Sequence, residues 1–363
     1  MVGLRLVNVS KKGRGKEVLK DVFLEVRDKE LFVLAGPPGA GKTTILKIVS
    51  GLVSPDEGEV YIGSEMVNAV PAAERDVGMV FETPAIYPNI TGFDNIAFPL
   101  TLKKLPEAEI KSRVTEIAQM LQISHLLDRK PTTYSGGELQ RVALARVLIR
   151  NPRVLLLDEP LKNLDAKIRE RMRAELKRLQ RELGITMIFS THDQLEAMTV
   201  GDRIAVMDDG VINQVDTPEK TYQSPRTVMV ARFIGSPTMN LIDCRLKEVD
   251  GRWMLDATDF EINVTRREEV TRAYSAGSSL VLGIRPEDIG IADLGKGASR
   301  TVGTIHMMQN IGDETVVAVK IGNTIMNTVI SKGRVVRYGE KVSVDLRDER
   351  VHIFDKKTKT AIL

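Results

Sequence analysis

The sequence predicts an α/β domain with a parallel core sheet, an antiparallel β subdomain and a helical insertion, followed by a smaller all-β domain. Up to about residue 225, short apolar segments that suit buried strands alternate with segments of helical periodicity. Beyond that point, short β-type segments recur between turns, which is typical of a small OB-like barrel or a sandwich. A length of 363 residues also favours two domains. We place the boundary near Gly235-Ser236-Pro237, which gives domains 1–235 and 236–363.

Each element of the first domain follows from its periodicity. Alternation of apolar and polar residues predicts the first two strands to be antiparallel, and the later apolar runs suit a buried parallel sheet. The predicted strands cover residues 4–9, 21–26, 31–35, 59–62, 77–81, 154–159 and 185–190, the last being the final core strand. The predicted helices begin near Gly41, span 110–121, follow Ser135 and span 166–183, with the helical insertion at about 83–150.

The second domain is predicted from alternation and turn chemistry in the same way. Its strands are expected at 279–284, 302–307, 314–321, 324–330, 341–346 and 350–354. Met307 and Met308 are interpreted as filler in the core of this domain.

Composition excludes several classes of protein. The net charge is +3 and aromatic residues make up 4%, so the chain lacks the basic and aromatic signature of a nucleic-acid surface, and we expect no nucleic-acid partner. Cys244 is the single cysteine, which excludes an intrachain disulfide and a multi-cysteine metal site. Residues 1–12 lack the apolar core of a signal peptide, and no apolar run reaches the ~18 residues of a spanning helix. We therefore expect a reducing cytosol, and a membrane role only through a partner.

The first domain is organised around a glycine-rich stretch that fits the phosphate-loop pattern G-x-x-x-x-G-K-[ST]. It lies between an apolar strand and a helix, where glycines let backbone N–H groups approach a phosphate and the helix N-terminus adds positive partial charge. Lys42 is expected to contact the β- and γ-phosphates, and the Thr43 hydroxyl to ligate Mg²⁺. The residues predicted to bind a nucleoside triphosphate are Gly36, Pro37, Pro38, Gly39, Ala40, Gly41, Lys42, Thr43 and Thr44.

Two acidic residues complete this site. Asp158 and Glu159 end an apolar strand, and the strand ends of a parallel sheet gather at one edge, beside the phosphate loop. Asp158 can hold Mg²⁺ through water, while Glu159 can accept a proton from the attacking water or orient it. Because an apolar run precedes them, we do not interpret these carboxylates as a surface acid pair.

A second glycine-containing stretch indicates the family. Ser135 can cap the helix that follows it, and Gly136 and Gly137 leave the amides at its start open to an anion. Between a phosphate loop and 154–159, the stretch 134–141 resembles the signature sequence of ATP-binding-cassette (ABC) ATPases. That resemblance implies that ATP is contacted by Ser135, Gly136, Gly137, Glu138 and Asp165. It also implies that His192 contacts the γ-phosphate and acts in catalysis with Lys42 and Glu159.

More narrowly, the chain is similar to the ATPase subunit of sugar importers of the maltose and glycerol-phosphate type. The stretches that carry this similarity are 77–81, 85–88, 95–100, 190–194 and, in a C-terminal regulatory domain, 283–288. The resemblance implies ATP and Mg²⁺ as cofactors and a second ATPase subunit, identical or different, with two ATP molecules sandwiched between the pair. It also implies two transmembrane permease subunits seated near 82–98, a solute-binding protein outside the cell, and a peripheral location on the cytoplasmic face of the membrane.

The chain departs from that family's pattern in four places. No aromatic residue for stacking on adenine lies near Lys12, and Arg14 can act as a cation–π substitute. Glu82 stands where the family has a glutamine that touches Mg²⁺, and it can ligate Mg²⁺ itself but adds negative charge. Lys162 replaces a serine, and Glu138 replaces a glutamine. We hypothesise from these departures that the subunit pairs with a different ATPase, which gives two unequal sites.

The leading prediction is an ATPase that energises import of a small solute, such as a sugar, a polyol or a sugar phosphate. A soluble ABC ATPase that acts on nucleic acid or ribosomes is the alternative, and a P-loop kinase is a third class. The C-terminal domain can bind an inhibitor or a transcription factor, or it can only stabilise a dimer. The transported solute is not predicted, because its recognition would lie in partner subunits.

Overall fold

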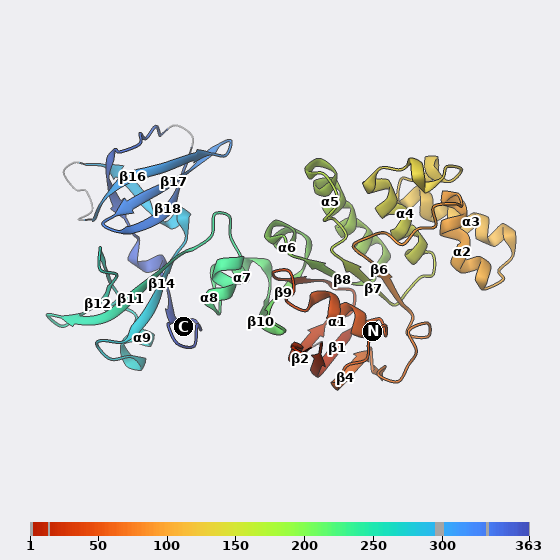
Figure 1. Ribbon diagram of the computed structural model, residues 1–363, viewed down its shortest axis with the longest axis horizontal. Helices are drawn as coiled ribbons and strands as arrows, with labels where there is room; N and C mark the ends of the chain where they lie inside the picture. Colours follow the sequence, from red (N-terminus) through yellow and green to blue (C-terminus); the bar gives the residue numbers. More distant parts are fainter. Residues whose placement is uncertain (1–2, 14, 295–300, 332–333, 363) are drawn as a thin grey trace. The chain divides into compact units, whose positions relative to one another are not determined.

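The computed structural model describes residues 3–13, 15–294, 301–331 and 334–362, and it divides into two compact units, Met1–Glu219 and Lys220–Leu363 (Figure 1). The predicted boundary near Gly235 would leave residues 220–234 with the first domain, whereas they pack within the second unit. The reason is Arg285, whose guanidinium donates hydrogen bonds to the carbonyl of Ile234 and, at 2.7 Å, to that of Tyr222. Since Arg285 is 2% exposed, this clamp fixes the segment onto the second unit.

The core of the first unit is a six-stranded sheet in the order β10-β9-β3-β8-β7-β6. All of its neighbouring pairs are parallel except that of β10 with β9. Its strands are β3 (Leu31–Ala35), β6 (Val77–Val80), β7 (Val154–Asp158), β8 (Thr186–Thr191), β9 (Arg203–Asp208) and β10 (Val211–Asp216). The parallel core is confirmed, but the prediction that 185–190 is the last core strand is wrong, because β9 pairs with β3.

A four-stranded antiparallel sheet, in the order β2-β1-β4-β5, forms the predicted antiparallel subdomain. Its strands are β1 (Leu4–Lys12), β2 (Glu17–Val26), β4 (Glu57–Ile62) and β5 (Glu65–Met66). One buried apolar cluster joins this sheet to the six-stranded sheet through α1 (Lys42–Val49) and includes Leu6, Val60, Ile45, Phe32 and Leu156. The helix that follows the phosphate loop is therefore held by the cores of both sheets.

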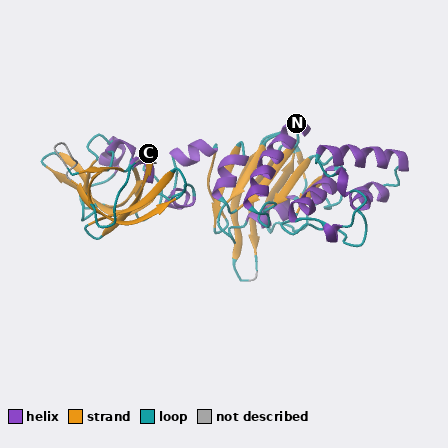
Figure 2. Ribbon diagram, turned by 90° about the horizontal axis from the view of Figure 1, so that it is seen from above, coloured by secondary structure: helices purple, strands orange, loops and turns teal. Residues whose placement is uncertain are grey.

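The helical insertion is confirmed, and its first helix begins at Gly92 rather than near residue 83. Thr91 fixes that start, because its hydroxyl accepts a hydrogen bond from the backbone N–H of Asp94 at 3.1 Å in a capping box. The helical elements of the first unit are α1, α2 (Gly92–Leu102), α3 (Glu107–Met120), η1 (Ser124–Leu126), η2 (Pro131–Thr133), α4 (Gly136–Leu148), α5 (Ala166–Leu183) and α6 (Gln194–Val200). Figure 2 shows these helices flanking the strands, and α5 has its predicted bounds.

The second unit is dominated by strands, as predicted (Figure 2). Two five-stranded sheets, β13-β12-β11-β14-β20 and β15-β19-β16-β17-β18, share one apolar core. The strands are β11 (Asn240–Val249), β12 (Arg252–Asp256), β13 (Glu261–Asn263), β14 (Ser279–Ile284), β15 (Gly290–Asp293), β16 (Thr301–Asn310), β17 (Glu314–Ile321), β18 (Thr324–Ser331), β19 (Lys341–Asp345) and β20 (His352–Asp355). The helical elements from the junction onward are α7 (Pro218–Gln223), α8 (Val228–Phe233), α9 (Glu268–Ala273), η3 (Pro286–Asp288) and η4 (Asp348–Arg350).

The prediction that two methionines of β16 fill the core of the second domain is wrong, because both are exposed. Met307 is 62% exposed and Met308 is 40% exposed. The register of β16 against β17 shifts between Ile305 and Met307, so the alternation of inward and outward side chains breaks at that point.

Within the described residues, no helix combines the length and the apolarity that crossing a bilayer requires.

Candidate active site

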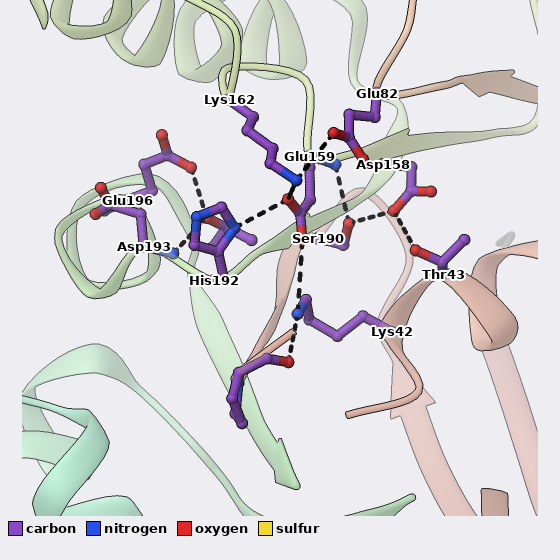
Figure 3. Close-up of polar contacts among 12 residues, drawn as sticks. Lys42, Thr43, Glu82, Asp158, Glu159, Lys162, Ser190, His192, Asp193 and Glu196 are labelled. Atoms are coloured by element: carbon purple, nitrogen blue, oxygen red, sulfur yellow. Dashed lines mark hydrogen bonds and ion pairs between the residues drawn. The ribbon is translucent and has the colours of Figure 1, made fainter. Parts of the chain in front are cut away.

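The parallel sheet brings the predicted site residues to one edge. Ala35 of β3 lies opposite Thr191 of β8, and Asp158 of β7 lies opposite Ser190 of β8. The phosphate loop, the acidic pair and the histidine each follow one of these strand ends, so they meet at the same edge (Figure 3). Glu82 reaches the edge from the segment that follows β6.

The phosphate loop closes around the ammonium group of Lys42. This group donates hydrogen bonds to the carbonyl oxygens of Gly36 at 2.8 Å and of Pro37 at 3.0 Å. Burial lowers the pKa of Lys42, which is 4% exposed, while the carboxylate of Glu159 opposes that shift. Gly41 starts α1 with φ 108°, a conformation that favours glycine. The loop thus presents backbone amides and one buried cation, which is the arrangement that binds phosphate.

Thr43, Asp158 and Ser190 form a small network of oxygen atoms beside the loop. The hydroxyl groups of Thr43 and Ser190 both donate to Oδ1 of Asp158, at 2.9 Å and 2.8 Å. A hydroxyl beside a carboxylate is a donor set that suits Mg²⁺. Ser190 was not predicted. The sequence shows it only as a polar residue near the end of an apolar strand, and its position opposite Asp158 is seen in the sheet.

The Glu159 carboxylate lies among three cationic or ionisable nitrogens. Its Oε2 atom is 2.9 Å from Nδ1 of His192 and 3.3 Å from Nζ of Lys162, and its Oε1 atom is 3.7 Å from Nζ of Lys42. Burial raises the pKa of Glu159, but His192 and Lys42 outweigh that effect and hold it below its usual range. The side chain is 12% exposed, so the surface-pair interpretation does not hold. The group is therefore an ionised carboxylate in a partly enclosed site, which is the form that can accept a proton.

The backbone of Glu159 is held in an uncommon conformation. Its φ is 44°, in the left-handed region that few residues other than glycine adopt. Its N–H donates to both the carbonyl oxygen of Ser190, at 3.2 Å, and the hydroxyl of Ser190, at 3.0 Å. Local strain held by surrounding contacts is common where a side chain must point at reacting groups.

Comparison with known proteins identifies the family. Residues 19–162 match the family model of the ABC transporter, residues 235–289 match a MalK OB fold domain, and residues 282–354 match a TOBE domain. The trehalose/maltose import ATP-binding protein MalK of Thermococcus litoralis is 44% identical, over 100% of both chains. This chain belongs to the ABC transporter family. As an ATP-binding subunit of that family it is an ATPase coupled to transport, and its second unit is the expected OB-like regulatory domain.

Other ABC relatives agree with this assignment. The xylose/arabinose import ATP-binding protein XacK of Haloferax volcanii is 41% identical over 95% of this chain and 90% of its own length. The maltose/maltodextrin import ATP-binding protein MalK of Escherichia coli K12 is 39% identical over 98% and 96%. A solved ATP-binding cassette, a dimer bound to ADP and phosphate, matches 59% of this chain and 98% of its own at 34% identity and TM-score 0.54.

The ABC signature residues lie at the start of α4. Ser135 and Glu138 form a capping box, in which Oε2 of Glu138 accepts from the N–H of Ser135 at 2.7 Å. That bond, more than the opposing effect of burial, lowers the pKa of Glu138 to about 2. Across the described part of the chain, no hydrogen bond or ion pair joins residues 135–138 to the phosphate loop. Their predicted contact with ATP stays a prediction.

The remaining ABC site residues are placed as follows. Asp165 caps α5 by accepting from the N–H of Ile168 at 3.0 Å, and its predicted contact with ATP stays a prediction. His192 is 37% exposed and its Nδ1 is engaged with Glu159, which leaves Nε2 for a phosphate. Arg14, the predicted substitute for an adenine-stacking aromatic, lies outside the described residues.

Two of the departures from the ABC pattern form an ion pair. Nζ of Lys162 is 2.9 Å from Oε1 of Glu82, and both side chains are 43% exposed. The sequence showed each departure separately and did not show that they meet. Their one shared signal is that two neutral residues of the pattern are replaced by residues of opposite charge.

Proposed function

We propose that this chain energises the import of a small solute, a sugar, a polyol or a sugar phosphate, by hydrolysing ATP to ADP and phosphate. The observation that carries the proposal is the convergence of the Lys42 ammonium and the Glu159 carboxylate, 3.7 Å apart, at one sheet edge. The names of the full-length relatives, which import maltose, trehalose, xylose or arabinose, support a sugar-type solute.

We infer the catalytic roles of three residues from these contacts. Lys42 exchanges its bonds to loop carbonyls for bonds to the β- and γ-phosphates, which the loop amides also bind. Glu159 orients the attacking water and takes up its proton. His192 holds Glu159 through Nδ1 and contacts the γ-phosphate through Nε2.

The oxygen atoms of Thr43 and Asp158 fit a Mg²⁺ ion that accompanies ATP, and Glu82 is a third candidate ligand. When bound, the ion supplies neutralisation of the charge on the phosphates. The Asp158 carboxylate and the Thr43 hydroxyl, already 2.9 Å apart, would hold it at the start of α1.

A second ATPase subunit would complete the site. The signature residues Ser135, Gly136 and Gly137 lie at the start of α4, where Ser135 caps the helix, and we propose that they contact the ATP of a partner subunit. The dimeric cassette with ADP and phosphate supports such a pair. An identical partner would give two equal sites, whereas a different ATPase would give the two unequal sites that we proposed from the departures.

An apolar groove on the first unit supports a permease partner. It has a volume of about 500 Å³, and apolar side chains from β6, α2 and α4 line most of it. Leu102 is 68% exposed there, and Arg146 lies 4.3 Å from the ring centroid of Tyr87 and 5.6 Å from that of Phe98 at its side. Such a groove suits the apolar face of a helix from another protein. We propose that two permease subunits use it, at the cytoplasmic face of the membrane, in a system that also has an extracytoplasmic solute-binding protein.

The experiment that tests this function is purification of the tagged full chain from detergent-solubilised membranes. We expect two integral membrane proteins to co-purify with wild type and to be lost with Leu102→Glu, while ATP binding is kept. Leu52→Glu is the matched control, since Leu52 is 54% exposed outside the groove. Membrane proteins retained by Leu102→Glu would contradict the groove, and RNA in their place would support the soluble alternative. Phosphate transferred to a small molecule rather than to water would indicate a kinase.

A further inference from the structure

Glu82, Lys162 and Glu159 form a chain of alternating charges at the edge of the active site (Figure 3). The Lys162 ammonium is 2.9 Å from Oε1 of Glu82 and 3.3 Å from Oε2 of Glu159. Glu159 continues the chain to His192 at 2.9 Å and to Lys42 at 3.7 Å. One ammonium group thus separates two carboxylates that would otherwise face the same phosphate-binding space.

This bridge connects two segments that are far apart in the sequence. Glu82 follows β6, whereas Lys162 lies in the loop between β7 and α5, in a turn where its N–H donates to the carbonyl of Glu159 at 3.2 Å. The side-chain amide of Asn163 reaches the carbonyl oxygen of Glu82 at 3.5 Å, so the same two segments also meet beside the ion pair. The loop that carries Lys162 therefore places its ammonium group beside Glu159. Glu82 reaches the same ammonium group from the segment that follows β6.

The pair contributes little to stability. Both side chains are 43% exposed, and exposed ion pairs are largely offset by side-chain entropy and solvent screening. In contrast, the Glu159 side chain is 12% exposed, so a neighbouring charge acts on it with less screening. The effect of the bridge thus falls on the catalytic carboxylate and on the phosphates that bind beside it.

We propose that Lys162 is a positioning residue for Glu159 and that Glu82 is its matched counter-charge, so that the two departures act as a single functional pair. The inference rests on the proposed function only in taking Glu159 to act on the water. If Lys162 is removed, the carboxylates of Glu82 and Glu159 both repel the triphosphate. Without Glu82, Lys162 is left to pair with Glu159 alone and draws that carboxylate from its water. If Lys162 and Glu82 both lose their charge, the net charge that they place beside Glu159 is again zero, as in wild type.

The test is a double-mutant cycle in the full chain with Lys162→Gln, Glu82→Gln and the double variant. ATP affinity is measured in EDTA, and kcat and KM are measured with Mg²⁺. We expect Lys162→Gln to weaken ATP binding in EDTA by about tenfold, a typical coupling between contacting charges. We expect Glu82→Gln to keep that affinity and to lower kcat. The double variant should return both quantities to within about threefold of wild type. Lys162→Arg should keep wild-type behaviour, because it keeps the charge.

A matched control separates this pair from a general effect of charge. Arg113 and Glu109, 2.6 Å apart on α3 and 48% and 40% exposed, form a similar ion pair outside the active site. The same cycle with Arg113→Gln and Glu109→Gln should leave ATP affinity unchanged throughout. Single variants at 82 and 162 that have no effect, or effects that multiply in the double variant, would overturn the inference. Because ATP affinity in EDTA needs neither hydrolysis nor a permease, it is independent of a failure of the proposed function.

Discussion

Replacing Glu159 by glutamine tests the assignment of the base most sharply. The amide has nearly the shape of the carboxylate, so the positions of Lys42, Lys162 and His192, at 3.7, 3.3 and 2.9 Å, should change little. The variant loses the negative charge and the capacity to take up a proton. Loss of a general base costs roughly 10²–10⁴-fold in rate, which is about 2.7–5.4 kcal/mol of barrier at 1.36 kcal/mol per tenfold.

ATP binding should survive this change. The phosphates meet the loop amides and Lys42, and removing a nearby carboxylate removes a repulsion from them. We would measure phosphate release under saturating ATP and the dissociation constant of ATP for the same preparation. Glu170→Gln is the control, because Glu170 is exposed on α5. If phosphate release by Glu159→Gln equals that of wild type, Glu159 does not act on the water and the account of the site is wrong.

Further predictions concern the loop and the signature helix. Lys42→Ala should abolish ATP binding in equilibrium titration, and a tight complex would contradict the phosphate-loop assignment. Gly36→Ala should disrupt the loop, because its Cβ would lie 2.1 Å from the carbonyl oxygen of Met207, whereas Gly39→Ala meets no atom within 4 Å and should cost only about 1–2 kcal/mol for its φ of 83°. Because the pKa of Glu138 is lowered from 4.5 to about 2, its stabilising effect is complete above the unfolded value and is lost as the pH falls toward 2. Urea midpoints of wild type and Glu138→Gln should therefore differ near neutral pH and converge in acid, and a constant difference would contradict this.

Most of the first unit could be predicted because its signals are local. The apolar strand before Gly36, the glycines of the loop and the helix 166–183 each carry their pattern within a few residues. The strand β9 was missed although Ile204 to Met207 are a buried apolar run. Its place beside β3 is set by long-range pairing and not by its own residues. In the same way, the register shift after Ile305 exposes Met307 and Met308 against the expectation from their composition.

The site residues show the same difference between local signals, which could be predicted, and long-range contacts, which could not. We could predict Asp158, Glu159 and Lys42 as site residues because the strand ends of any parallel sheet meet at one edge. The ion pair of Glu82 with Lys162 was not predicted, because it joins two loops whose approach depends on the packing of complete strands. The capping role of Glu138 was also missed, although Ser135 followed three residues later by a glutamate is the usual sequence of a capping box.

The central claim is that ATP hydrolysis at Glu159 drives solute import. We would test this by measuring the uptake of a panel of labelled sugars into vesicles that contain the full chain with its co-purified permease subunits and a solute-binding protein. We predict that uptake of one sugar requires ATP on the side of this chain and is lost with Glu159→Gln. Uptake that continues undiminished without ATP, or with Glu159→Gln, would contradict it.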